Sequence, residues 1–338
     1  MNINKENTRQ IFADFSRLKI MIIGDVMLDD YIIGDVSRIS PEAPVPVVDI
    51  KSRYACLGGA ANVALNIKSL GATPVLCSVI GEDKKSDDFL NIMQKENLSI
   101  NGIIKSKDRI LTTKYRAIGN NMQLLRLDSE ITEQLSQKDE DDFLKLLSNI
   151  IDNQKIDAII FEDYDKGIIT PTLINQLVFI AKEKSIPVSV DPKKRNFLQY
   201  NNIDLFKPNL KELNEGLQLK KYSSFNSNYL HNAVEQFMRE KQHKHLLLTL
   251  SGDGIAIYFS ENNTINYVHI PACLRNIADV SGAGDTVISV ATLCMTLGMS
   301  MKDVAMIANL AGGLVCEKVG VVAIDKKELQ YEVEIIAD

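Results

Sequence analysis

Residues 279–287 have the sequence Asp-Val-Ser-Gly-Ala-Gly-Asp-Thr-Val and stand directly before a long apolar stretch. The pattern predicts a helix over roughly 283–297 whose first turn is built from small residues. Small residues let backbone amides converge without side chains in the way. A helix start adds free N–H groups and the positive end of the helix dipole. The segment therefore predicts an anion hole suited to a phosphoryl group in transfer.

Asp285 lies in the first turn of this predicted helix, within reach of an anion bound there. A carboxylate in that position can accept the proton of a substrate hydroxyl as its oxygen attacks phosphorus. We therefore predict Asp285 as the general base, with the amides of Gly282, Ala283 and Gly284 holding the phosphoryl group. The structural alternative is a glycine-rich helix start capped by aspartate.

Two other phosphate-binding patterns do not fit the chain. A dinucleotide fingerprint needs a third glycine where Val287 stands, and it usually follows the first strand of a βαβ unit. A Walker A loop, GxxxxGK[ST], is absent. Any kinase chemistry in this protein would therefore need a different phosphate cradle.

The composition is that of an ordinary globular protein, with 45% of the 338 residues hydrophobic and 24% charged. The net charge is −6 and no basic tract is present, which argues against nucleic acid as a partner. The five cysteines form no CxxC pair, so we expect reduced thiols. Residues 1–10 lack a signal peptide core and no apolar run is long enough to cross a membrane, so we expect a cytoplasmic protein.

Short apolar runs alternate with amphipathic segments along the chain. The predicted strands are 19–24, 74–80, 158–161, 187–190 and 246–250, and the predicted helices are 60–70, 86–97, 170–184 and 229–241. This alternation predicts an α/β fold with a mostly parallel central sheet and helices on both faces. His243 and His245 precede a strand run, and we interpret them as its entry rather than as a metal pair.

Two segments, about 31–54 and 109–127, interrupt this alternation. The first is rich in proline with short β-type pieces, and the second has the pattern of a hairpin. We expect them to form a small β-sheet lid inserted in a single domain that spans residues 1–338. Two surface excursions without a role are the alternative.

Four segments together resemble the PfkB carbohydrate kinases. Residues 279–287 resemble the C-terminal signature of that family, and residues 57–64 resemble its N-terminal glycine signature. Residues 207–212 are similar to its Asn-x-x-Glu element. Residues 248–254 are similar to its nucleotide loop, although two glycines are closer together than in that pattern. The matches follow the family's order, and the resemblance implies a ribokinase-like fold, ATP and Mg²⁺.

Within this family the chain most closely resembles the heptose 7-phosphate kinases of ADP-heptose synthesis. The resembling segments are 24–29, 37–47, 113–116, 163–167 and 191–193. Many members of that group carry a nucleotidyltransferase domain with an HxGH element, which this chain lacks. We therefore expect a stand-alone kinase, with a separate nucleotidyltransferase acting downstream.

The resemblance implies substrate contacts at the carboxyl ends of the strands and in the lid. A carboxylate after the first strand, Asp25, would accept from sugar hydroxyls, with Asn62 donating and Arg38 closing from the lid. Two glycines, Gly58 and Gly59, would let the backbone approach the sugar. The candidates for a second phosphate are the cations Lys114, Arg116, Arg126, Lys166 and Lys193, of which we favour Lys193 and Arg116.

The resemblance also implies the nucleotide side. Asn209 and Glu212 would position Mg²⁺ through water, with helix capping as the rival explanation. The predicted ATP contacts are Asn209, Glu212, Thr249, Ser251, Gly252, Gly254, Gly282 and Gly284. Asp279 and Ser281 resemble the family's monovalent-cation loop, so K⁺ is a candidate cofactor.

The expected reaction is transfer of the γ-phosphoryl group of ATP to the anomeric 1-hydroxyl of a heptose 7-phosphate. Lid strands with open edges pair across a dimer in related kinases, so we expect a homodimer. Three alternatives stay open at this stage. They are a kinase for another substrate (fructose 6-phosphate, tagatose 6-phosphate, ribose or a nucleoside), a catalytically inactive sugar-phosphate sensor, and a dinucleotide oxidoreductase.

Overall fold

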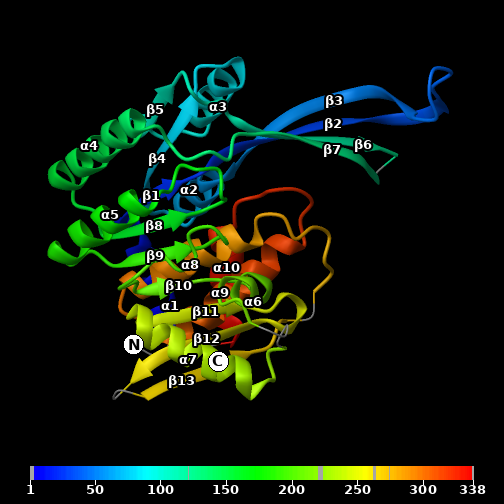
Figure 1. Ribbon diagram of the computed structural model, residues 1–338. Helices are drawn as coiled ribbons and strands as arrows, with labels where there is room; N and C mark the ends of the chain where they lie inside the picture. Colours follow the sequence, from blue (N-terminus) through cyan, green and yellow to red (C-terminus); the bar gives the residue numbers. More distant parts are fainter. Residues whose placement is uncertain (1–3, 121, 220–223, 262–263, 274, 337–338) are drawn as a thin grey trace.

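The central feature of the computed structural model is a nine-stranded sheet, and the model describes residues 4–120, 122–219, 224–261, 264–273 and 275–336 (Figure 1). The strand order is β13-β12-β11-β10-β9-β8-β1-β4-β5. Pairing is parallel from β11 to β5 and antiparallel at β11-β12-β13. The strands are β1 (Lys19–Gly24), β4 (Thr73–Gly81), β5 (Ile103–Ser106), β8 (Ala158–Glu162), β9 (Val188–Asp191), β10 (Leu205–Phe206), β11 (His245–Thr249), β12 (Ile255–Glu261) and β13 (Thr264–Ile270).

Helices cover both faces because the inner strands are apolar on both sides. In β1 the side chains of Ile20 and Ile22 join one hydrophobic cluster, while Met21 and Ile23 join the other. The first cluster includes residues of α1 (Lys5–Asp14), α2 (Ala60–Ser69), α3 (Lys84–Lys95), α8 (Ala283–Thr296), α9 (Met301–Cys316) and α10 (Lys326–Ile336). The second includes residues of α4 (Gln137–Asn153), α5 (Pro171–Glu183), α6 (Leu210–Gly216) and α7 (Asn228–Lys241).

A second sheet of four strands has the order β3-β2-β6-β7 and projects from the body (Figure 1). Its strands are β2 (Val26–Ile39), β3 (Pro46–Gly59), β6 (Thr112–Gly119) and β7 (Met122–Ser129). The expected β-sheet lid is confirmed, and we call this sheet the lid. Its first two strands are longer than predicted, because they continue directly from the end of β1 and into α2. Asn121, in the predicted hairpin turn, lies outside the described residues.

The strands and helices predicted from hydrophobic patterning are confirmed to within a few residues. His243 is buried and stacks on Phe206 with ring centroids 4.7 Å apart. Burial lowers the pKa of His243 to about 3. It is therefore a neutral core residue, and His245 begins β11, which agrees with the predicted entry to a strand. Within the described part of the chain, no helix is long and apolar enough to cross a membrane.

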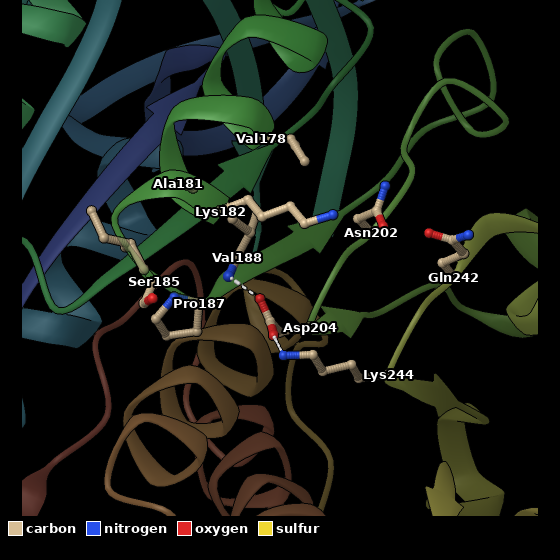
Figure 2. A pocket seen from close by; sticks show the side chains of 11 residues that line it. Val178, Ala181, Lys182, Ser185, Pro187, Val188, Asn202, Asp204, Gln242 and Lys244 are labelled. Atoms are coloured by element: carbon tan, nitrogen blue, oxygen red, sulfur yellow. Dashed lines mark hydrogen bonds and ion pairs between the residues drawn. The ribbon is translucent and has the colours of Figure 1, made fainter. Parts of the chain in front are cut away.

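A cavity of about 330 Å³ lies at the amino ends of β9 and β10, beside the end of α5 (Figure 2). Its central acid, Asp204, accepts from the Val188 amide at 2.8 Å and pairs with Lys244 at 2.6 Å. Ligands of parallel α/β sheets bind at the carboxyl ends of the strands. This cavity is at the opposite end, and its acid already has partners, so we do not regard it as the functional site.

Candidate active site

The candidate site lies where the carboxyl ends of the central strands meet the start of α8. Glu162 ends β8, Asp191 ends β9, and Lys207 directly follows β10. All three side chains are buried, as is Asp285 in the first turn of α8. The site therefore occupies the edge of the sheet where parallel α/β proteins bind ligands.

Asp285 is held in place by two donors. Asn62 Nδ2 donates to its Oδ2 at 2.7 Å, and the Tyr164 hydroxyl donates to its Oδ1 at 2.8 Å. Burial raises the pKa of Asp285 to about 6, although these two hydrogen bonds act in the opposite direction. A carboxylate with this pKa is ionised at neutral pH and still basic enough to take a proton.

The start of α8 has the geometry of an anion hole. Gly282 precedes the helix at φ +81°, and a Cβ there would lie 2.8 Å from Asn62 Nδ2. The Thr286 amide donates back to the Gly282 carbonyl at 3.0 Å and begins the helical ladder. The Ala283 amide, predicted to hold the phosphoryl group, donates to the Val280 carbonyl at 3.3 Å. A Cβ at Gly284 would lie 3.5 Å from Lys207 Nζ. The helix start therefore faces a buried ammonium group.

Two lysines and two acids form a network beside the anion hole. Lys207 Nζ lies 2.7 Å from Asp191 Oδ2, and Lys193 Nζ contacts Glu212 and lies 3.6 Å from Asp191 Oδ1. Burial opposes ionisation of Asp191, but the charges of Lys193 and Lys207 hold its pKa below its usual value. Two ammonium groups are thus fixed beside the start of α8, and each is paired with a carboxylate.

The residues predicted for Mg²⁺ and ATP also meet here. Asn209 and Glu212 form a capping box at the start of α6, with both side-chain-to-backbone distances at 2.8 Å. The backbone of Asn209 forms an isolated parallel β-bridge with Thr249 at the end of β11. Gly254 has φ +90°, and a Cβ at Gly252 would meet only open space. The capping alternative is therefore observed, and it leaves water-mediated magnesium binding as a prediction.

Asp25 has a different environment from the one expected of a sugar ligand. Its carboxylate is buried and accepts from the amides of Tyr164 at 2.7 Å, Lys166 at 3.1 Å and Ile168 at 3.2 Å. Asp25 thus orders the loop after β8, which carries Tyr164. Asn62 likewise donates to Asp285, where we expected it to donate to sugar.

Asp29 is the acid that sequence reasoning missed. It is buried on β2 and pairs with Arg116 on β6. A Cβ at Gly58 would lie 2.6 Å from Asp29 Oδ2, so glycine is needed to leave room for the carboxylate. At Gly59, with φ +59°, a Cβ would clash with the Asp25 carbonyl at 2.4 Å. Side chains alternate between the two faces of a strand, so Asp29 and Tyr31 lie on the same face. This alternation was the signal that could have identified Asp29.

One face of the lid carries three of the five predicted cations. Asp29 of β2 is opposite Lys114 of β6, and Arg116 of β6 is opposite Arg126 of β7. Residues that are opposite each other on paired strands share a face of the sheet. Lys114 Nζ lies 5.4 Å from the centre of the Tyr164 ring, which connects this face to the base. Arg126 is more exposed and pairs with Asp128 at 3.0 Å.

The other two cations and Arg38 lie elsewhere. Lys166 pairs with Glu130 at 2.8 Å, and Lys193 belongs to the network around Asp191. Arg38 is near the far end of β2, 13 residues beyond Asp25, which corresponds to roughly 40 Å along an extended strand. The fold therefore does not bring Arg38 to the site of its own chain.

Tyr164, Lys207, Glu162 and Asp191 also escaped the list of candidates. Three of them end a strand or directly follow one, and that position was the available signal. The candidate potassium loop is compact, because Asp279 accepts from the amides of Ser281 at 2.9 Å and Gly320 at 3.0 Å.

Comparison with known proteins identifies the family. The family model described as "pfkB family carbohydrate kinase" matches residues 17–327. The chain belongs to this family. It is therefore a phosphotransferase that acts on a sugar hydroxyl, as the anion hole and Asp285 indicate.

Curated relatives of this kinase are longer than the chain. The bifunctional protein HldE of Desulfatibacillum aliphaticivorans is 36% identical over 322 residues, which are 95% of this chain and 64% of that protein. The bifunctional protein HldE of Helicobacter pylori strain P12 is 37% identical over 302 residues, covering 89% of this chain and 64% of the relative. The chain thus spans just under two thirds of these relatives.

Solved structures confirm the ribokinase-like fold. Phosphofructokinase-2 from Escherichia coli, in complex with potassium, has a TM-score of 0.74 and 16% identity, covering 95% of this chain and 99% of that one. Ribokinase from Arabidopsis thaliana, complexed with ribose and ATP, has a TM-score of 0.71 and 16% identity, covering 94% and 98% of the two chains. At this identity the likeness concerns the fold.

Proposed function

We propose that this kinase transfers the γ-phosphoryl group of ATP to the anomeric 1-hydroxyl of a heptose 7-phosphate. The observation that carries the proposal is the placement of Asp285 between an anion hole and a cationic lid face. The anion hole suits the phosphoryl group in transfer, and the lid cations suit a substrate that already carries a phosphate. The similarity to HldE proteins supports heptose as the sugar.

ATP would lie over the end of β11 and the start of α8. Thr249, Ser251, Gly252 and Gly254 would contact the nucleotide, and Gly282 and Gly284 its phosphates. Asn209 and Glu212 would hold Mg²⁺ through water, and the ion would neutralise phosphate charge. The capping box supports this role, because it fixes both side chains, and Glu212 contacts Lys193 of the network around Asp191. Potassium at the Asp279 loop remains a further candidate.

Lys193 belongs to the nucleotide side in this scheme. It contacts Glu212 and Asp191, and both neighbours lie beside the anion hole. We therefore assign the second phosphate of the sugar to Lys114 and Arg116, with Lys166 nearby and Arg126 toward the rim. This revises our preference for Lys193 as a ligand of that phosphate.

The sugar would lie between the lid and Asp285. The buried carboxylate of Asp29, next to Gly58, would accept hydrogen bonds from the hydroxyls of the sugar. Asp285 would take the proton of the 1-hydroxyl as its oxygen bonds to the γ-phosphorus and the bond to the β-phosphate oxygen breaks. The products are the sugar 1,7-bisphosphate and ADP. Closure of the lid would exclude water, which limits wasteful hydrolysis of ATP.

A homodimer would complete the assembly. The outer part of the lid exposes apolar side chains, among them Ile39, Val45 and Ile50. Arg38 lies in this outer part of the lid. It could reach the site of a second copy, although it does not reach the site of its own chain. Pairing of two lids is therefore our proposal for the oligomer.

A coupled assay of ADP release tests the function. The panel contains D-glycero-D-manno-heptose 7-phosphate, fructose 6-phosphate, ribose and adenosine, each with wild type and Asp285→Asn. Turnover of the heptose phosphate alone, lost in the variant, supports the proposal. Turnover of another sugar would retain the kinase and reject heptose. Binding without turnover of any compound would favour a sugar-phosphate sensor.

A further inference from the structure

Three carboxylates from different elements converge beneath the anion hole. Glu162 ends β8, Asp191 ends β9 and Asp285 lies in the first turn of α8. One oxygen of each lies within 4.8 Å of the others, and all three residues are at most 3% exposed. Carboxylates that are this close together and shielded from water repel one another unless a cation or a proton lies between them.

Glu162 is the member of this group that lacks a partner. Neither of its carboxylate oxygens is exposed, and neither has a hydrogen-bond partner among the described residues. Asp191 Oδ1 is also without a hydrogen bond, although it forms a long ion pair with Lys193 at 3.6 Å and the other oxygen pairs with Lys207 at 2.7 Å. Buried polar atoms almost always have a partner, so two adjacent unsatisfied groups indicate a ligand that the protein chain does not supply.

The local charges favour a cation as that ligand. Fully ionised, the three acids together with Glu212, which pairs with Lys193, exceed the two nearby lysines, Lys193 and Lys207, by two negative charges. Both oxygens of Glu162 are buried without a hydrogen-bond partner among the described residues, so the ionised form of this side chain needs a compensating charge. Clustered carboxylate oxygens are the ligands that Mg²⁺ and Mn²⁺ prefer.

We propose that Glu162 and Asp191 bind a divalent cation directly, with Asp285 at its edge, before any nucleotide arrives. The free oxygens of the first two acids supply the ligands. Asp285 contributes mainly charge, because both of its oxygens already accept hydrogen bonds from Asn62 and Tyr164. The cation would be of the magnesium or manganese class.

This site differs from the one proposed for the nucleotide's Mg²⁺. One oxygen of the Glu212 carboxylate accepts a hydrogen bond from the Asn209 amide, and the other accepts one from Lys193. Glu162 has no such contacts. The inference also does not depend on heptose as the substrate, because it concerns the protein without sugar or ATP.

The test is Mn²⁺ binding to the full chain without nucleotide or sugar, measured from the electron paramagnetic resonance signal of free Mn²⁺. Wild type is expected to sequester Mn²⁺ in an equimolar amount, and Mg²⁺ to compete for the site. Glu162→Gln keeps the shape of the side chain and removes a charged ligand. We expect it to weaken Mn²⁺ binding by roughly tenfold or more, in line with the effect of perturbing metal sites.

Glu212→Gln is the matched control, with the same change in charge on the nucleotide side. It is expected to keep Mn²⁺ binding within about twofold of wild type, since Glu212 lies outside the unsatisfied pair. Thermal unfolding provides a second measurement. Mn²⁺ should raise the melting temperature of wild type and of Glu212→Gln, but not that of Glu162→Gln. The Glu162→Gln protein without metal should melt no earlier than wild type, which shows that it folds.

Three outcomes overturn the inference. If wild type binds no Mn²⁺ in the absence of nucleotide, a proton is the partner of Glu162. If Glu162→Gln binds Mn²⁺ as wild type does, the ligands lie elsewhere. If only Glu212→Gln loses binding, the ion belongs to the nucleotide site. None of these results depends on turnover, so failure of the proposed sugar kinase function would be seen separately in the ADP assay.

Discussion

Tyr164 links the two halves of the site at the level of a single residue. Its hydroxyl donates to Asp285 at 2.8 Å, while Lys114 and Lys193 lie 5.4 Å and 5.2 Å from the centre of its ring. One ammonium group comes from the lid and the other from the network beside the anion hole. Tyr164 therefore positions the base and contacts both cationic regions, although it carries no charge.

The change Tyr164→Phe should shift the pH dependence of kcat/KM. In the wild-type protein the hydrogen bond from Tyr164 lowers the pKa of Asp285. Without that bond the pKa should rise above about 6. A base must be deprotonated, so activity should fall at acidic pH and recover in alkaline buffer. The acidic limb should move up by about one to two pH units, the range for a hydrogen bond to a charged group. The exposed Tyr331→Phe is the control, and an unmoved limb in Tyr164→Phe would contradict the assignment.

Asp25 and Asp29 should separate stability from sugar binding. Asp25→Asn places an amide nitrogen against backbone donors in a buried site, so the free energy of unfolding should fall by about 2–4 kcal/mol. Asp29→Asn should mainly raise KM for the sugar. Urea unfolding and steady-state kinetics measure the two effects. A stable Asp25→Asn protein with a raised sugar KM would restore Asp25 as the sugar ligand.

At the scale of elements, the start of α8 depends on one backbone conformation. Gly282 has φ +81°, which L side chains rarely adopt, and its missing Cβ leaves room for Asn62. Gly298, past the other end of the same helix, has φ +72°, but a Cβ there meets nothing within 4 Å. The two glycines therefore share a backbone conformation that would strain any other residue, and they differ in their contact with the site.

Alanine at these two positions should separate the two effects. Gly282→Ala and Gly298→Ala should each lower the free energy of unfolding by about 1–2 kcal/mol, because both put a side chain in the left-handed region. Only Gly282→Ala should also lower kcat, since its Cβ would displace Asn62 from Asp285. Urea unfolding and the ADP assay measure the two quantities. Equal loss of kcat in both variants would mean that the clash with Asn62 is unimportant.

The lid acts as an element through the charge on one face. Lys114→Ala should raise KM for a phosphorylated sugar by about 10–100-fold, since a charged hydrogen bond contributes about 1.5–3 kcal/mol. KM for ATP should change little. Lys51→Ala is the control, because Lys51 is an exposed lid residue whose ion pair, in the part of the chain that the structure describes, is with Asp35. Similar KM values in both variants would show that the phosphate binds elsewhere.

At the scale of the whole molecule, the lid projects far from the core that orders the site (Figure 1). An extended sheet with exposed apolar residues is a surface that another chain can cover. We predict a homodimer, and sedimentation equilibrium at micromolar concentration should give twice the chain mass of 37.7 kDa. Ile50→Lys, on the outer lid, should shift the mass toward the monomer. A wild-type protein that sediments only as a monomer would contradict this.

Hydrophobic patterning predicted the central elements well, because buried parallel strands are apolar runs bounded by turns. Residues 19–24 and 158–161 became β1 and β8 within one residue, and the helix predicted over 283–297 became α8. Asp285 could be predicted because it belongs to a local motif, in which the helix start and the base are neighbours in sequence. The lid was predicted as a layer, but its reach was not, since strand length depends on pairing between distant segments.

The roles of individual polar residues were decided only by the tertiary structure. Sequence alone determined the fold class and the position of Asp285 in the first turn of a glycine-rich helix start, since each depends on a local pattern. It could not distinguish Asp25 from Asp29, because both follow β1, and only folding brings three amides to one and Arg116 to the other. It also could not show Glu162 without a partner beside Asp191. A buried charge is defined by what surrounds it, and these neighbours lie on strands far apart in the chain.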